Sequence, residues 1–236
     1  MNVSSDRKLV AIVGITVLLT TALLWFISQP DDGAFGQGPK PAAPDPKALA
    51  LYEAIDAADL ARITTILDTD PDLLKYRFGM EGTVLHVAAR RNRVDVVRLL
   101  VHRGAQLTAR GQWNGTPLHW ACWWGAKDAA TELLRLGSEL EDKGDAFGST
   151  PLLWACHGSS NNLRSMGGDF AGTVRMLLAN GADGATTNAQ GVPAAAMANN
   201  DVADILRAHG VAVPPPGQHP APGSPGATTR PDKLII

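Results

Sequence analysis

Residues 115–125, which read Gly-Thr-Pro-Leu-His-Trp-Ala-Cys-Trp-Trp-Gly, decide the fold of this 236-residue chain. Related phrases begin at Thr83 (TVLHVAA) and at Thr150 (TPLLWAC). The spacing from Thr83 to Thr116 is 33 residues, and from Thr116 to Thr150 it is 34. Copies of one phrase at a fixed period indicate a stack of repeats, each too small to bury its apolar face alone.

Each phrase predicts the beginning of a short helix. The threonine hydroxyl can cap that helix, and a proline at the next position, such as Pro117, needs no amide donor. A second apolar segment follows, for example Val94–Leu100, and Gly104 stands beyond it, where a left-handed residue commonly ends a helix. The repeating unit is therefore predicted to be two helices joined by a turn.

The phrase and its period resemble the ankyrin repeat. The resemblance implies an all-α solenoid of about five helix-turn-helix repeats over residues 48–210, with capping repeats at its two ends. It also implies that the motif histidines, His86 and His119, bond the backbone of the hairpins that connect repeats. Leu153 replaces this histidine in the fourth copy.

The fourth repeat carries an insertion. Pro117 to Leu133 is 16 residues, whereas Pro151 to Leu177 is 26, so about ten extra residues fall between its helices, at about 158–170. A longer loop adds little closure entropy, so the stack should tolerate it. Long loops on rigid scaffolds often carry binding residues, and a functionally neutral insertion is the alternative.

Residues 9–27, LVAIVGITVLLTTALLWFI, predict a transmembrane helix. They carry no charge and would span about 28 Å, close to the thickness of the hydrocarbon core. Basic residues precede the segment and aspartates follow it, so residues 1–8 should be cytoplasmic and the repeats should lie across the membrane. We expect a bacterial, single-pass inner-membrane protein with a periplasmic repeat domain. The alternative is a cleaved signal peptide that leaves a periplasmic or secreted protein.

Two other segments have compositions that predict disorder. Residues 28–47 form a linker and residues 211–236 form a tail, both rich in proline and glycine.

The formal net charge of −2 gives no reason to expect a nucleic-acid partner. Cys122 and Cys156 hold equivalent places in adjacent repeats, whose helices pack about 8–10 Å apart, too far for a disulfide. We therefore expect two free, buried thiols. We also expect a monomeric protein.

The resemblance also implies where a partner would bind. In ankyrin proteins, partners usually bind a groove between the hairpin tips and the exposed ends of the inner helices. The tip residues here lie three positions before each motif threonine, and Arg90-Arg91, Trp123-Trp124 and His157-Gly158 stand at the helix ends. Since Trp and Arg most often dominate interface energies, we predict a Trp/Arg groove. The predicted partner-binding residues are Met80, Arg90, Arg91, Trp113, Trp123, Trp124, Phe147 and His157.

Two features of this groove have structural alternatives. One member of the Trp123-Trp124 pair could fill a gap in the core under the insertion. The second repeat is also rich in arginine, which indicates either a solvated face or attraction to an acidic partner. These arginines are Arg90, Arg91, Arg93, Arg98 and Arg103.

The sequence contains no phosphate-binding loop, no GxSxG phrase and no metal-binding spacing of His and Cys. We therefore expect no catalytic residue, no cofactor and no metal. The predicted function is that of a membrane-tethered scaffold for an unidentified protein partner. The alternatives are an envelope-polysaccharide binder, whose tryptophans stack on sugar rings, and an accessory protein that shields one periplasmic enzyme.

Overall fold

The computed structural model describes residues 45–160 and 167–213. Within them the chain is helical, and its only β-pairing is a pair of isolated bridges, Arg77–Thr83 and Thr187–Pro193. The α-helices are α2 (Pro46–Ala57), α3 (Leu60–Thr69), α4 (Val84–Arg90), α5 (Val94–His102), α6 (Pro117–Trp123), α7 (Lys127–Arg135), α8 (Pro151–Ser160), α9 (Phe170–Ala179), α10 (Ala194–Met197) and α11 (Asn200–Ala208). The 3₁₀ turns are η1 (Pro71–Lys75), η2 (Gly79–Glu81) and η3 (Gln112–Asn114).

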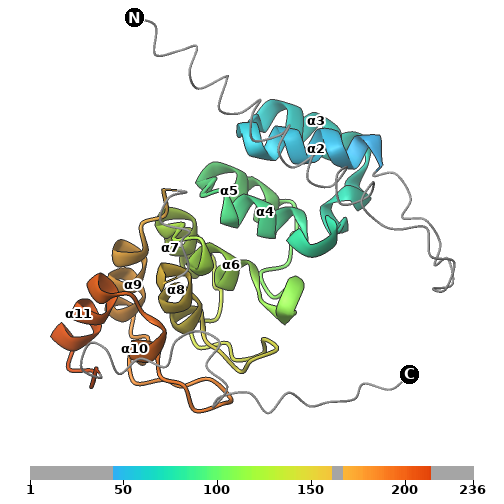
Figure 1. The fold of residues 1–236 in the computed structure, drawn as a ribbon. Helices are drawn as coiled ribbons and strands as arrows, with labels where there is room; N and C mark the ends of the chain where they lie inside the picture. The colour runs from blue at the N-terminus through green and yellow to red at the C-terminus, as the bar shows by residue number, and fades with distance from the viewer. Residues whose placement is uncertain (1–44, 161–166, 214–236) are drawn as a thin grey trace, which may run out of the picture. The chain divides into compact units, whose positions relative to one another are not determined.

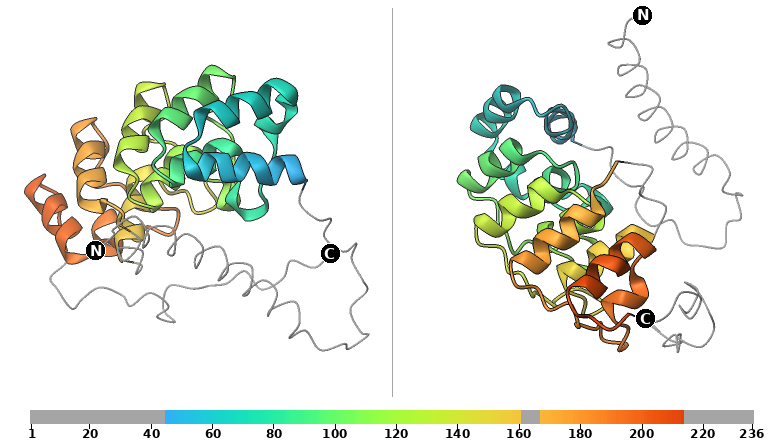
Figure 2. Two further views of the ribbon diagram at one scale, coloured as in Figure 1. Left: turned by 90° about the horizontal axis from the view of Figure 1, so that it is seen from above. Right: turned by 90° about the vertical axis from the view of Figure 1, so that its left-hand side faces the viewer.

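The described helices form five successive pairs, α2/α3 to α10/α11, which stack side by side (Figures 1 and 2). The first helix of each pair, called the inner helix below, contacts the inner helices of the neighbouring pairs, in the order α2, α4, α6, α8, α10. The second helices, called the outer helices, make a parallel row in the order α3, α5, α7, α9, α11. This arrangement is the all-α helix-turn-helix solenoid that the sequence predicts.

The motif threonine caps its helix as expected. The Thr116 hydroxyl accepts a hydrogen bond from the His119 amide (3.4 Å), and His119 Nδ1 accepts one from the Thr116 amide (3.2 Å). Pro117 is the first helical residue. At the start of the stack, α2 begins at Pro46, two residues before the expected boundary, because Asp45 Oδ1 accepts from the Lys47 amide (2.9 Å).

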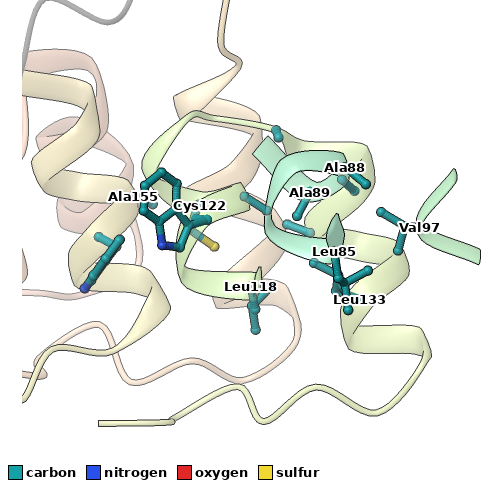
Figure 3. Packing of buried hydrophobic residues seen from close by; sticks show 14 of the residues in the cluster. Leu85, Ala88, Ala89, Val97, Leu118, Cys122, Leu133 and Ala155 are labelled. Carbon is teal, nitrogen blue, oxygen red and sulfur yellow. The ribbon is translucent and has the colours of Figure 1, made fainter. Parts of the chain in front are cut away.

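The core lies between the two rows of helices. Leu85 and Leu118 from the first row and Val97 and Leu133 from the second are completely buried, and small alanines let adjacent helices approach (Figure 3). Cys122 is among these buried residues, and both cysteines are free thiols, as predicted. Burial raises the pKa of both thiols, that of Cys156 to about 12. These cysteines act as small apolar core residues.

The fourth repeat differs from the prediction because its insertion begins as helix and not as a loop. In the second and third repeats the chain leaves the inner helix through a left-handed residue, Asn92 (φ 53°) or Gly125 (φ 64°). Ser159 stands at the equivalent position and stays helical, so α8 runs to Ser160. His157 and Gly158 therefore lie within α8 and do not end it. Residues 161–166 of the insertion lie outside the described part of the chain.

Glycine allows the extended α8 to lie against α6. A Cβ atom at Gly158 would come within 2.3 Å of the Trp123 carbonyl oxygen. Near the end of the insertion, the Asp169 amide donates to the Gly125 carbonyl (2.9 Å), and the Asp169 side chain caps α9 through the Gly172 amide (2.7 Å). The extra turn of α8 also holds the fifth repeat, since Ser159 Oγ accepts from the Asn199 amide (3.1 Å).

The predicted transmembrane segment, residues 9–27, the linker to residue 44 and the tail from residue 214 lie outside the described residues. Among the residues described, none of the helices has the length and apolar character needed to cross a bilayer. The membrane anchor stays a prediction from the sequence.

Candidate functional site

The hairpin tips carry exposed apolar side chains. Met80, Trp113 and Phe147 are 70%, 42% and 43% exposed, and each lies three residues before its motif threonine or its equivalent. The tips are joined to one another: Gln112 Nε2 donates to Met80 Sδ (3.3 Å), and the Ala146 amide donates to the Trp113 carbonyl (2.7 Å). A row of apolar side chains therefore follows one edge of the stack.

Trp113 is held in an unusual backbone conformation. It has φ 52° and ψ 22°, the next residue Asn114 has φ 59°, and the Gly115 amide donates to the Gln112 carbonyl (3.2 Å). Two successive positive φ values define a type I′ turn, which favours Asn-Gly. A left-handed conformation costs a residue with a Cβ atom about 1–2 kcal/mol. Contacts of the indole ring must offset this strain.

Those contacts come from a cluster of four tryptophans. The Trp113 ring lies 6.2 Å from that of Trp120, nearly parallel at 12°, and 6.0 Å from those of Trp123 and Trp154. The rings of Trp123 and Trp154 are 5.7 Å apart and steeply inclined. Edge-to-face and offset geometries of this kind are favourable between aromatic rings. The cluster therefore fixes the position of the exposed Trp113.

The sequence prediction missed Trp120 and Trp154. Both are almost fully buried, so they support the exposed rings from beneath. A signal was present: each follows its motif threonine by four residues, so one inner-helix position carries an indole in two successive repeats. Spacing alone does not show that this position faces the hairpin tips.

A buried carboxylate orders the fourth hairpin around this cluster. Asp145 Oδ2 accepts from the Trp154 indole N–H (2.7 Å), and Oδ1 accepts from the amides of Phe147 (3.1 Å) and Ser149. The third repeat has no such carboxylate. Its equivalent position is Gly111, where the His86 ring leaves no room for a side chain, since a Cβ atom would come within 2.9 Å of that ring. Asp145 thus fixes both an indole of the cluster and the tip that carries Phe147.

The cluster forms one wall of an open pocket of about 240 Å³. His157 lies on its rim, with its ring 4.8 Å from that of Trp123 and nearly perpendicular to it. Burial of part of the imidazole lowers the pKa of His157, so the ring is mostly neutral at pH 7. The pocket is lined by Trp113, Trp123, Phe147, Ser149, Leu153, Trp154, His157, Asn188 and Met197, none of which is an acid, a lysine or an arginine.

The structure does not bring all the predicted groove residues together. Trp123 lines the pocket, whereas its neighbour Trp124 does not, and the Arg90 guanidinium stacks on the Trp124 ring at 5.3 Å. Both indoles are half-buried and pack against the core. The predicted groove is therefore divided, with an aromatic pocket on one side of α6 and an Arg90–Trp124 contact on the other.

The arginines of the second repeat are compensated by the chain itself. Arg90, with a side chain only 14% exposed, pairs with Glu81 (2.9 Å) and donates to the Tyr52 hydroxyl (3.1 Å). Arg91 pairs with Asp56 (2.8 Å). On the outer helices, Arg98 pairs with Glu132 (2.8 Å) and Arg103 with Asp68 (2.8 Å), while Arg93 donates to the Asp56 carbonyl. The basic composition of this repeat is thus matched by nearby acids.

The motif histidines have the structural role that the resemblance implies. His86 is fully buried; its Nδ1 accepts from the Thr83 amide (3.1 Å), and its Nε2 lies 3.1 Å from the Gly115 carbonyl in the next repeat. His119 Nε2 lies 3.1 Å from the carbonyls of Asp142 and Ser149. Burial lowers the pKa of both rings, that of His86 to about 4. Each neutral ring ties one repeat to the next hairpin.

Comparisons with known proteins identify the repeats. A family model described as ankyrin repeats (three copies) matches residues 51–144. The chain is 31% identical over 100 residues to palmitoyltransferase Hip14 of Drosophila melanogaster, a stretch that covers 42% of this chain and 16% of that protein. It is 30% identical over 122 residues to the E3 ubiquitin-protein ligase XBAT33 of Arabidopsis thaliana, covering 51% and 24%. It is 38% identical over 71 residues to the serine/threonine-protein kinase VIK of the same plant, covering 30% and 16%.

The repeats within residues 51–144 are therefore ankyrin repeats, as predicted. Each of these relatives is matched over less than a quarter of its length, so the similarity concerns the repeats and not the activities for which the relatives are named. All three are eukaryotic proteins and give no support to the expected bacterial source.

Proposed function

We propose that this protein is a non-enzymatic binding protein whose ankyrin repeats capture a protein partner at the pocket formed by Trp113, Trp123 and Trp154. Ankyrin repeats generally mediate contacts between proteins, and the observation that carries the site is this apolar pocket beside exposed hairpin tips. Met80 and Phe147 would extend the contact along the row of tips. An apolar anchor of the partner would enter the pocket, and polar contacts would surround it.

The size and chemistry of the pocket support a side chain as its occupant. Sites for drug-sized ligands typically have volumes of about 300–1,000 Å³, and this pocket is smaller, at about 240 Å³. Its polar lining consists of Ser149, His157 and Asn188, so it offers few partners for the many hydroxyls of a sugar. An aliphatic or aromatic side chain of a partner protein suits it better than a polysaccharide does.

Arg90, Arg91 and Trp124 belong to a different part of the proposed interface. Because Arg90 and Arg91 already pair with Glu81 and Asp56, an acidic partner would have to displace acids of this chain. We therefore propose that they shape the surface beside the pocket and contribute less to affinity than Trp113 and Trp123.

The strained turn supplies a substitution that separates binding from stability. In Trp113→Asn the new residue suits a positive φ, which offsets part of the lost ring packing. The protein and this variant would be crosslinked in cells that express them, and the captured proteins identified. Arg175→Ala, an exposed change on α9 in the outer row of helices, is the matched control.

We expect Trp113→Asn to lose the partner that wild type and Arg175→Ala both capture, with a thermal midpoint within a few degrees of wild type. Equal capture by all three proteins would refute the pocket as the binding site. Binding to isolated envelope polysaccharide, lost in Trp113→Asn, would favour the sugar-binding alternative.

We also propose that residues 9–27 anchor the protein in a membrane, with the repeats on the non-cytoplasmic side. The support comes from the sequence: nineteen uncharged residues of sufficient length, with Arg7 and Lys8 before them. The protein should remain in the membrane pellet after extraction at alkaline pH, and protease added outside intact cells or spheroplasts should digest the repeats. Recovery in the supernatant would contradict the membrane anchor. Full protection from protease would contradict the proposed orientation of the repeats.

A further inference from the structure

The pocket is open at the point where the column of indoles ends. Pro193 caps α10 and pairs with Thr187 as Thr83 pairs with Arg77, so Pro193 stands at the motif-threonine position of the fifth repeat. Four residues later, where the third and fourth repeats carry Trp120 and Trp154, the fifth carries Met197. A flexible thioether replaces a third indole, and the unfilled space beside Trp154 is the pocket.

An apolar segment of the chain is tethered to the same repeat. The described part of the chain ends in the fifth repeat, where the Val211 amide donates to the Leu206 carbonyl (3.1 Å). Residues 214–233 then contain no Leu, Ile, Val, Met, Phe, Tyr or Trp, and the next three residues are Leu234, Ile235 and Ile236. A polar, proline-rich stretch is thus followed by three adjacent aliphatic residues.

The length of the tail suffices for it to reach the pocket. Twenty residues separate Val213 from Leu234. A flexible chain of this length has a root-mean-square span of roughly 25 Å, and a proline-rich one extends further. Asn188 and Met197 of the pocket belong to the same repeat as the start of the tail, so the segment need not cross the whole stack. Such a tether gives an effective concentration of about a millimolar.

We propose that the Leu234-Ile235-Ile236 segment docks intramolecularly in the pocket formed by Trp113, Trp123, Phe147, Trp154 and Met197. The pocket is apolar and lined by no charged side chain, which matches aliphatic side chains and disfavours an acidic or basic occupant. Combined with the proposed function, on which this consequence rests, the docked tail competes with the external partner. A partner must therefore bind the pocket with enough affinity to displace the docked tail.

The experiment compares the full-length protein with the triple variant Leu234→Ser/Ile235→Ser/Ile236→Ser. The readout is acrylamide quenching of tryptophan fluorescence, because a docked tail covers the exposed faces of Trp113 and Trp123. The matched control is Thr228→Ser/Thr229→Ser, which alters the same tail without changing its apolar segment. We expect a larger quenching constant for the triple variant than for the wild type and the control, because the undocked tail leaves Trp113 and Trp123, two of the six tryptophans, open to acrylamide.

A synthetic peptide of residues 227–236, added to the triple variant, should restore the lower quenching saturably, whereas the peptide with three serines should not. Phe147→Ser in the triple-variant background should weaken the effect of the peptide, because Phe147 lines the pocket. Identical quenching of wild type and triple variant would overturn the proposal. Protection that rises with protein concentration would overturn its intramolecular form. Neither result affects partner capture, so the proposed function is tested separately.

Discussion

Replacing His86 by leucine should flatten the acid dependence of stability. His86 is completely buried between the second and third repeats, and burial lowers its pKa from 6.5 to about 4. The folded state therefore holds the neutral ring, while the unfolded chain takes up a proton as the pH falls below 6.5. The stabilisation is fully present above pH 6.5 and is lost as the pH falls from 6.5 towards 4.

The size of the effect follows from the shift. About 2.5 pKa units at about 1.36 kcal/mol per unit gives a ceiling of about 3.4 kcal/mol, of which about 2.4 is lost between pH 7 and 4.5. His119 contributes a loss of the same sign, because burial lowers its pKa too. Measurements should stop near pH 4.5, since below it a second effect adds to the loss. Arg135 and Arg98 lower the pKa of Glu132 from 4.5 to about 2 in the folded state, so the unfolded chain takes up this proton first.

The assay is urea unfolding at several pH values between 7.5 and 4.5. Leucine is the replacement because Leu153 occupies the same position in the fourth repeat. At pH 7 the variant should be less stable by about 1–3 kcal/mol, because the Thr83 amide and the Gly115 carbonyl lose their buried partner. Its stability should fall less between pH 7 and 4.5 than that of wild type. His102→Leu, an exposed change on α5, is the matched control for the substitution itself, and equal slopes in wild type and His86→Leu would refute the reasoning.

Three further predictions concern the packing around the pocket and the core. Asp145→Asn should lower the free energy of unfolding by about 1–3 kcal/mol and increase the mobility of Phe147, because the carboxylate holds an indole N–H and two amides; unchanged stability in urea would count against it. Gly158→Ala should destabilise by about 1–3 kcal/mol through the clash with the Trp123 carbonyl, whereas the exposed Ser160→Ala should not; equal thermal midpoints would contradict the close contact. Both cysteines should react with a thiol reagent only on unfolding and should appear unlinked in non-reducing mass spectrometry, because they are buried and their pKa values are raised; rapid labelling of the native protein would exclude their burial.

The repeat organisation was predictable because it depends on local chemistry that recurs at a fixed period. Thr116 and Pro117 specify a helix start wherever they occur, and the 33- to 34-residue spacing specifies how successive pairs stack. The free state of Cys122 and Cys156 followed from the same spacing. Such inferences need only the sequence, since neighbours in the stack are also neighbours in the chain.

The course of the fourth repeat was less predictable, because a composition rich in Gly and Ser suggests a loop. The deciding feature is a missing residue: Asn92 and Gly125 adopt a left-handed conformation, and Ser159 at the same place does not. Left-handed geometry favours Gly and Asn, so an alignment of the three copies by this position contains the signal. The average spacing of the repeats does not contain this signal.

The candidate site was predicted in part, because resemblance assigns positions but not the directions of side chains. Trp123 is the last residue of α6 and Trp124 caps its end, and successive positions along a helix point about 100° apart. One therefore faces the pocket and the other faces Arg90. The buried Trp120 and Trp154 entered no prediction, although they determine where the exposed Trp113 can lie.

The location of the pocket follows from what each repeat places in one column of the stack. This column, four residues after the helix cap, holds Val87, Trp120, Trp154 and Met197 in successive repeats. Beside the two indoles, the strained Trp113 is held by ring contacts that the shorter Val87 could not provide. Beyond them, Met197 leaves space that a third indole would fill. A solenoid of nearly equivalent units thus acquires one distinctive site where the column changes from large to smaller side chains, and partner selection at that site depends on its irregular positions more than on the shared motif.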